Sequence, residues 1–142
     1  MFLDIKIKHL REGVLPVQAH GDWIDLRCAE TIELKAGEYC EIPLGVAMKL
    51  PYGYEAHLVV RSSTFKKYGI IQTNGIGIID NDYCGNTDEW KLPVYAITDT
   101  VILKNDRIAQ FRIFKRQEDL VFTMVDELED NDRGGFGSTG RG

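Results

Sequence analysis

Short apolar runs that alternate with polar residues recur along most of the chain and restrict the possible fold more than any other feature. A period of two residues is that of a β-strand with one buried face, and β-branched residues are frequent in these runs. Turn-forming residues separate the runs at short intervals, as in Ala19–Asp22 and Lys35–Glu38. The predicted strands are Ile5–Leu10, Trp23–Cys28, Tyr39–Ile42, Val46–Lys49, Glu55–Val60, Ile70–Gln72, Gly75–Ile79, Leu92–Ile97, Val101–Leu103, Ile108–Lys115 and Leu120–Val125. Many short strands without alternating helices predict an all-β sandwich, barrel or jelly roll.

One short helix is expected over Ser62–Gly69. The segment begins with residues that cap helix N-termini, continues with Lys66 and Lys67, and ends at a glycine, which suits the position after a helix. A helix start directly after a strand can bind an anion through its free N–H groups. A capped surface helix without a ligand explains the segment equally well.

The C-terminal end has a different composition from the rest. An acidic stretch over 126–132 is followed by ten residues of which five are glycine, so a mobile arm is expected. Phe136 within this arm has no packing reason to be there. The spacing of Gly135 and Gly140 resembles a P-loop, but Arg141 replaces the lysine and no helix can follow. Two interpretations of the arm remain. It is either a glycine-rich nest of N–H groups that folds around phosphates or a frayed tail.

Size and charge limit the possible classes of protein. The chain has 142 residues, enough for one domain with a core, and a net charge of −5, which argues against a partner such as nucleic acid. No apolar run approaches the ~20 residues that span a membrane, and a cytoplasmic location is expected. The three cysteines match no metal, redox or disulfide spacing. The three histidines show no zinc-binding pattern.

The segment from Asn74 to Gly85 carries the strongest local signal. Two glycines interrupt an apolar strand, which brings its backbone unusually close to another group, and Asp80 and Tyr83 follow at a turn. Asp80 can orient a water molecule, and Tyr83 can pack flat against a sugar. A hairpin that carries acidic turn residues is the alternative.

Five segments in order resemble the five motifs of the trimeric deoxyuridine triphosphate nucleotidohydrolases, the dUTPases. They are Gly21–Leu26, Arg61–Ser63 with the lysines and Gly69 after it, Asn74–Gly85, Arg107–Gln110 and Arg133–Gly140. The resemblance covers essentially the whole chain. It departs from the family at Cys84 and Asn86, and the loop over 86–90 is about three residues longer.

The resemblance implies a homotrimer of distorted jelly-roll, β-clip subunits that hydrolyse dUTP to dUMP and pyrophosphate with Mg²⁺. It divides the chain into a catalytic domain over 1–126 and a flexible arm over 127–142. Each active site is then shared: the segments around Arg61 and Arg107 come from one chain, the Asn74–Tyr83 hairpin from a second, and the arm from a third. No direct protein ligand to Mg²⁺ is expected, because that ion binds phosphate oxygens and waters.

The same resemblance assigns roles to individual residues. Asp80 holds the attacking water. Asn74 and the backbone of Gly77, Ile78 and Ile79 bind uracil, and Tyr83 excludes a 2′-hydroxyl. Asp25 and Arg107 form a structural ion pair, and Asp25 is also a candidate for contact with the waters around the metal. The remaining residues bind the phosphates or cover the base: Arg61, Ser62, Ser63, Gln110, Arg133, Phe136, Gly137 and Ser138.

Two other functions are considered. The related deoxycytidine triphosphate deaminases share the fold and an Arg-Ser-Ser segment, and Glu89 is the only nearby candidate for the glutamate that this reaction needs. A regulatory module that binds a partner protein through a nucleotide-gated arm is the second alternative.

Overall fold

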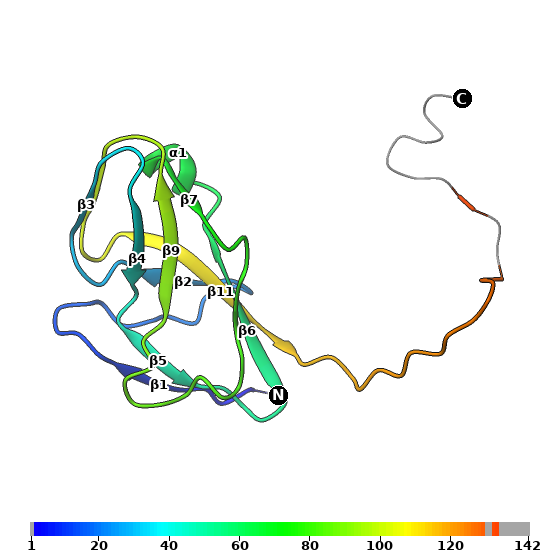
Figure 1. Ribbon diagram of the computed structural model, residues 1–142. Helices are drawn as coiled ribbons and strands as arrows, with labels where there is room; N and C mark the ends of the chain where they lie inside the picture. The colour runs from blue at the N-terminus through cyan, green and yellow to red at the C-terminus, as the bar shows by residue number, and fades with distance from the viewer. Residues whose placement is uncertain (1, 130–131, 134–142) are drawn as a thin grey trace.

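The computed structural model describes residues 2–129 and 132–133. Its strands are β1 (Lys6–His9), β2 (Ile24–Arg27), β3 (Ile32–Leu34), β4 (Tyr39–Pro43), β5 (Val46–Lys49), β6 (Tyr54–Val60), β7 (Ile70–Gln72), β8 (Gly77–Ile79), β9 (Lys91–Ala96), β10 (Thr100–Ile102) and β11 (Arg107–Lys115). A single helix, α1 (Thr64–Tyr68), lies between β6 and β7 (Figure 1). Within the described residues no helix has the length and apolarity needed to cross a membrane.

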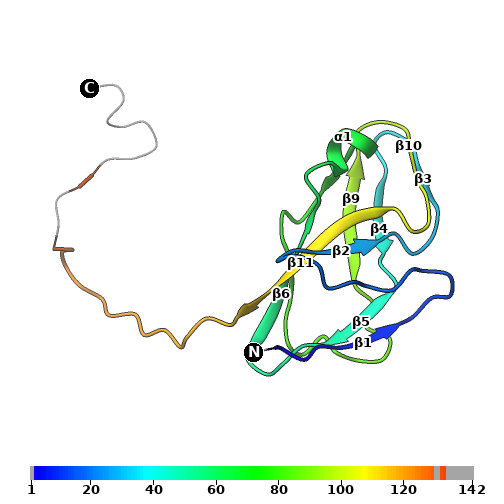
Figure 2. The same ribbon diagram turned by 180° about the vertical axis from the view of Figure 1, so that it is seen from behind.

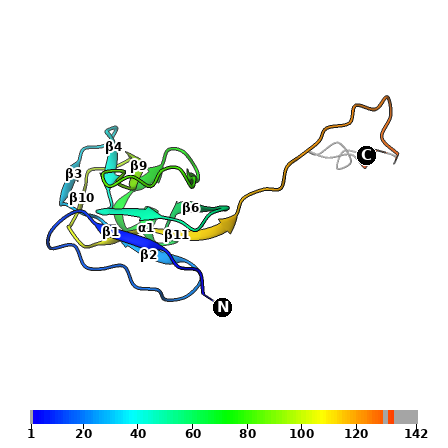
Figure 3. The ribbon, with the colours of Figure 1, turned by 90° about the horizontal axis from the view of Figure 1, so that it is seen from below.

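Two sheets face each other across the core. One has the strand order β2-β11-β6-β8 and the other β4-β9-β7, and the pairs β1-β5 and β10-β3 extend the structure (Figures 2 and 3). All these pairs are antiparallel. This arrangement confirms the predicted all-β, jelly-roll-like fold with one short helix.

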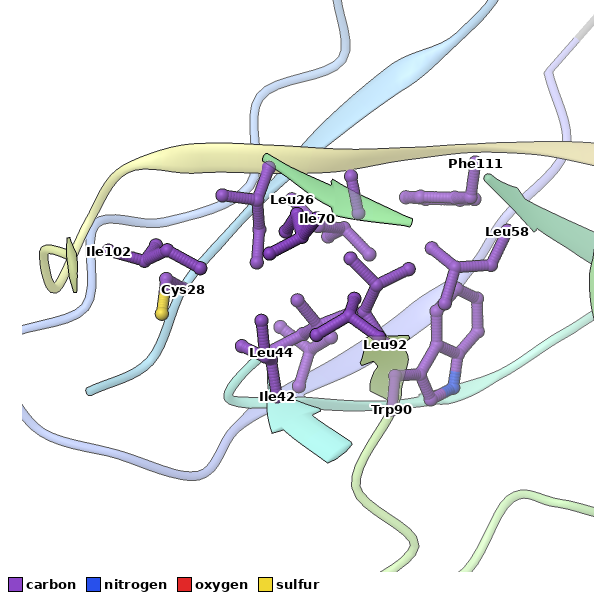
Figure 4. Packing of buried hydrophobic residues seen from close by; sticks show 14 of the residues in the cluster. Leu26, Cys28, Ile42, Leu44, Leu58, Ile70, Trp90, Leu92, Ile102 and Phe111 are labelled. Carbon is purple, nitrogen blue, oxygen red and sulfur yellow. The ribbon is translucent and has the colours of Figure 1, made fainter. Parts of the chain in front are cut away.

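The core lies where the apolar faces of the two sheets meet. Leu26 and Leu58 from the larger sheet point toward Ile42 and Leu92 from the smaller one, and each of these side chains is essentially inaccessible to solvent (Figure 4). Trp90 closes one end of the core and contacts Phe111 edge-on, with ring centroids 5.1 Å apart. The alternation in the sequence therefore marks the inward side of the strands correctly.

The short helix agrees with the prediction at its end but not at its start. Gly69 follows it with φ 64°, the left-handed conformation expected of a glycine there. Ser63 makes no capping hydrogen bond. Instead the Thr64 hydroxyl accepts a hydrogen bond from the Arg61 N–H and donates one to the Ile108 carbonyl, and this ties the helix to β11. Ser63 therefore stands at the predicted N-cap position but does not cap the helix with its side chain, and the hydroxyl that bonds the backbone here belongs to the buried Thr64.

Other predictions about strands need correction. The strand over Gly75–Ile79 begins only at Gly77, because Asn74 to Ile76 form a tight turn with Gly75 at φ 69°. The three-residue strand β3 was not predicted. Cys84 is exposed, Cys28 is buried and Cys40 is half-buried, and all three are free thiols.

The segment 116–129 contains no strand, so the predicted strand Leu120–Val125 is wrong for the single chain. Beyond β11 the chain runs away from the body in all three views (Figures 1–3). Large apolar side chains of this segment are exposed, namely Leu120, Val121, Phe122, Met124, Val125 and Leu128. The division at residue 126 stays a prediction.

Candidate active site

A cavity of about 570 Å³ lies beside the hairpin that follows β7, and we call it the hairpin cavity. Its volume is in the range of pockets that hold a small organic ligand. Every hairpin residue predicted to bind the nucleotide or to act on it lines this cavity: Asn74, Gly77, Ile78, Ile79, Asp80 and Tyr83. The cavity is also lined by residues that sequence reasoning did not assign to substrate binding: Glu41, Leu58, Asp82, Glu89, Trp90, Lys91 and Pro93.

Strand β8 gives this cavity a backbone edge. It is the last strand of its sheet and pairs only with β6 among the described residues, with Gly77 opposite Leu58. Edge strands carry a row of N–H and C=O groups that face away from the sheet. The backbone of Gly77–Ile79 can therefore bind the polar edge of a planar ligand.

Asp80 lies at the end of β8, where the chain turns. Its Oδ1 accepts a hydrogen bond from the Asp82 N–H at 2.9 Å, and its carbonyl accepts one from the Tyr83 N–H. The next residue fixes the turn to the body, since Asn81 Nδ2 donates to the Pro51 carbonyl at 2.8 Å. The Asp80 carboxylate is exposed and keeps its other oxygen available to a ligand or a water.

Tyr83 is fixed by a hydrogen bond at the tip of its ring. Its hydroxyl donates to the Glu89 carbonyl at 2.8 Å, across the loop over 84–88. Desolvation raises the pKa of Tyr83, and the nearby carboxylates of Asp88 and Glu89 act in the same direction. The hydroxyl therefore stays protonated at neutral pH, and the ring has a defined place in the cavity wall.

Glu89 is held by partners distant in the sequence. Its side chain is only 11% exposed, and both carboxylate oxygens accept hydrogen bonds from Arg11, at 2.8 and 2.9 Å. The Gly45 N–H donates to the same carboxylate at 3.0 Å. Burial opposes ionisation of Glu89, but these donors outweigh it, and the net pKa lies below its ordinary value. Glu89 is thus an ionised structural anchor for the loop that carries Tyr83.

A second group of predicted residues lies on another part of the surface. Asp25 on β2 bridges two arginines: its Oδ1 is 3.1 Å from Arg61 Nε and its Oδ2 is 3.5 Å from Arg107 NH1. The predicted pair of Asp25 and Arg107 is therefore present, and Arg61 joins it. We call Asp25, Arg61 and Arg107 the arginine cluster.

Two predicted phosphate-binding groups adjoin this cluster. Ser62 and Ser63 follow Arg61 and are exposed, and Gln110 donates to the Val60 carbonyl at 3.4 Å. Among the residues that the structure describes, neither these three nor the arginine cluster line the hairpin cavity. One chain thus does not bring the two groups into the same cavity.

The predicted residues of the arm are described only in part. Arg133 is exposed, whereas Phe136, Gly137 and Ser138 lie outside the described residues. Their assignment stays a prediction.

Known proteins resemble this chain over nearly its full length. The family model for dUTPase matches residues 21–140. The SPbeta prophage-derived deoxyuridine 5′-triphosphate nucleotidohydrolase YosS of Bacillus subtilis is 53% identical over 140 residues, which are 97% of this chain and 99% of that protein. The chain belongs to the dUTPase family.

Further relatives agree with this assignment. A deoxyuridine 5′-triphosphate nucleotidohydrolase of Thermobifida fusca is 39% identical over 89% of this chain and 72% of that protein. The solved dUTPase of Staphylococcus bacteriophage 80alpha with dUpNHpp has the same fold, with a TM-score of 0.77 and 22% identity over 96% of this chain and 98% of that one.

Proposed function

We propose that this member of the dUTPase family hydrolyses dUTP to dUMP and pyrophosphate in the cytoplasm. The observation that carries the proposal is the hairpin cavity, because six residues assigned from one stretch of sequence line the same space. The free edge of β8 suits a base, the Asp80 carboxylate suits a reacting phosphate, and the Tyr83 ring suits a sugar.

Uracil binds against the free edge of β8 and the side-chain amide of Asn74. The backbone accepts a hydrogen bond from the N3–H of uracil and donates to one of its carbonyl groups. Cytosine presents the opposite pattern of donors and acceptors at these positions. Its binding would leave groups in the cavity unpaired, at about 1–3 kcal/mol each. The Tyr83 ring packs under the deoxyribose and leaves no space for a 2′-hydroxyl.

Asp80 positions a water molecule for attack at the α-phosphorus and takes its proton. Its exposed carboxylate has one oxygen engaged with the Asp82 N–H, so the group is oriented by the turn and still accepts a proton from water. The anchoring of Asn81 to Pro51 supports this role, because it holds the turn against the body.

Arg61, Ser62, Ser63 and Gln110 bind the phosphates through charge-assisted hydrogen bonds. Mg²⁺ binds through the triphosphate and its own waters, as that ion prefers, with Asp25 as a contact for those waters. The Asp25 carboxylate lies beside these phosphate-binding groups, with its oxygens directed at Arg61 and Arg107. When bound, the ion neutralises negative charge on the leaving pyrophosphate.

We further propose that the working form is a homotrimer whose sites combine residues of different chains. The separation of the arginine cluster from the hairpin cavity supports this, since one chain does not bring them to one space. The exposed apolar side chains of segment 116–129 also support it, because a single chain leaves them largely open to solvent. In this arrangement the arm over 127–142 brings Arg133, Gly137 and Ser138 to the phosphates and Phe136 onto uracil.

The deaminase alternative is disfavoured by the surroundings of Glu89. A catalytic glutamate must exchange protons with the substrate, whereas both oxygens of this carboxylate accept hydrogen bonds from Arg11 and one of them also accepts a bond from Gly45. The lowered pKa of Glu89 also makes it a poor proton donor at neutral pH.

The proposal is tested by measuring pyrophosphate release from dUTP, UTP and the four standard deoxynucleotides, each with and without Mg²⁺. We expect release from dUTP only, and a marked loss when the ion is chelated. Ammonia release from dCTP without pyrophosphate would instead support the deaminase.

A further inference from the structure

Gln72 is a buried polar side chain for which the mechanism above has no use. It ends β7 and is only 9% exposed. Its Oε1 accepts a hydrogen bond from the Val60 N–H at 3.0 Å, and its Nε2 donates to the Leu58 carbonyl at 3.0 Å. A backbone N–H only donates and a backbone C=O only accepts, so strand β6 fixes which end of this amide is which.

The second hydrogen of Gln72 Nε2 fixes the neighbouring Asn74. It is donated to Asn74 Oδ1 at 2.9 Å, so the oxygen of that amide faces Gln72 and its Nδ2 lies at the other end. Nδ2 lies close to Gly77 of β8, where a Cβ atom would be 3.5 Å from it. Both Asn74 and Gly77 line the hairpin cavity. Asn74 therefore offers donors to a ligand there rather than an acceptor.

We propose that Gln72 is a positioning residue that sets the choice of base, and this inference rests on the proposed function. A donor from Asn74 matches the carbonyl that uracil carries at C4 and faces another donor where cytosine carries an amine. Asn74 is itself exposed and can turn over when Gln72 does not hold its oxygen. Loss of the Gln72 donor then allows the acceptor end of Asn74 to face the ligand and weakens the rejection of cytosine.

The test compares kcat/KM for dUTP and dCTP in the full-length enzyme and in Gln72→Met, which has similar length but cannot donate. We expect the preference for dUTP to fall by about tenfold, mostly through better use of dCTP. The control is Ile70→Val, a buried change in the same strand that does not contact Asn74. It should lower stability and leave the preference unchanged, which separates positioning from a merely structural role.

The contact itself is tested in an Asn74→Ala background, where Gln72→Met should no longer change the preference. If Gln72→Met does not fold, Gln72→Glu tests the same contact, because it can still accept from Val60 but cannot donate to Asn74 when ionised. The inference would be overturned if a folded Gln72 variant kept the preference for dUTP over dCTP. It would also be overturned if Gln72→Met changed this preference equally in the Asn74→Ala background. A parent enzyme that does not hydrolyse dUTP would instead refute the proposed function.

Discussion

The hairpin cavity and the arginine cluster differ in how complete each is within one chain. The cavity has an edge strand and a ring that is fixed by its hydrogen bond to the nearby Glu89 carbonyl, and Asn81 ties its turn to the distant Pro51. In the arginine cluster the two guanidinium groups are directed at Asp25, and Asp25 and Arg107 line only a smaller cavity of about 110 Å³.

The two regions differ in the part of the substrate that each is proposed to bind. Recognition of base and sugar needs rigid shape, which one folded chain supplies. Binding of a triphosphate needs many charges in one place, which are costly to gather in a single chain without a ligand. In the proposed trimer, several chains together supply them where the triphosphate binds.

The largest effect is expected from removal of the arm, because neither the hairpin cavity nor the arginine cluster covers the bound substrate in this account. Deletion from Arg133 onward should lower kcat/KM for dUTP by about 10³-fold, since it removes a charged phosphate contact and a stacking ring together. Steady-state hydrolysis measures the loss. Light scattering on the same protein should give the same number of subunits as for the full-length chain, and full activity of the truncated enzyme would exclude a role for the arm.

Within the cavity, Asp80→Asn should lower kcat by ~10²-fold or more while dUTP still binds. The amide keeps the shape of the turn but does not accept the proton of the attacking water. Kinetics together with binding of a non-hydrolysable analogue measure the two effects separately. Near-normal turnover would remove Asp80 from the mechanism.

In the arginine cluster, Arg61→Gln should raise KM and lower kcat/KM by roughly 10- to 100-fold through loss of a charge-assisted bond to phosphate. Arg112→Gln is the matched control, because Arg112 lies over the ring of Phe114 rather than beside Asp25. Equal effects of the two changes would mean that overall charge, not this cluster, binds the substrate.

The role of the cavity ring is tested by Tyr83→Ala, which should raise the ratio of kcat/KM for UTP to that for dUTP by about tenfold. The ring is removed and space for a 2′-hydroxyl opens. Tyr83→Phe keeps the ring and loses only the bond to the Glu89 carbonyl, so its ratio should change less. An unchanged ratio in the alanine variant contradicts the assigned role.

The smallest change is expected from Arg11→Gln, which acts on the support of the cavity. The free energy of unfolding at pH 7 should fall by about 1–2 kcal/mol, because Glu89 loses its charged donor. The folded pKa of Glu89 is lowered, so its contribution is present above the ordinary carboxyl pKa and is lost as pH falls through the folded value. Denaturation from pH 7 to pH 3 should show the difference between parent and variant shrinking toward acid. A constant difference would assign the effect to packing alone.

Sequence reasoning found the hairpin residues because the cavity edge, the carboxylate and the ring lie within ten residues of one another. It found Arg61 and Asp25 only through the family resemblance, since nothing local links them. The contacts of Arg11 with Glu89 join residues 78 positions apart, and no local pattern predicts them.

The sequence does carry a signal for Gln72, namely a polar residue at a strand position that is expected to be buried. It stands at an inward position of an alternating strand after the buried Ile70, where an apolar residue is expected. For the segment Leu120–Val125, by contrast, the sequence pattern predicted a strand that is not present. Its apolar run suggested a strand, but a strand needs a neighbouring edge, and among the described residues none pairs with it.

The central claim is that a working site joins the hairpin cavity of one chain to the arginine cluster of another. Asp80→Asn and Arg61→Gln proteins, each with a lowered kcat/KM for dUTP, can be mixed under conditions that exchange subunits and assayed at dUTP concentrations below KM. Exchange is confirmed by mass spectrometry of differently tagged chains. Random assembly at equal amounts should then place an intact cavity beside an intact cluster in about a quarter of the sites and restore about that share of the parent activity. If the mixed assemblies form and stay as inactive as the separate variants, each site lies within one chain and the account is contradicted.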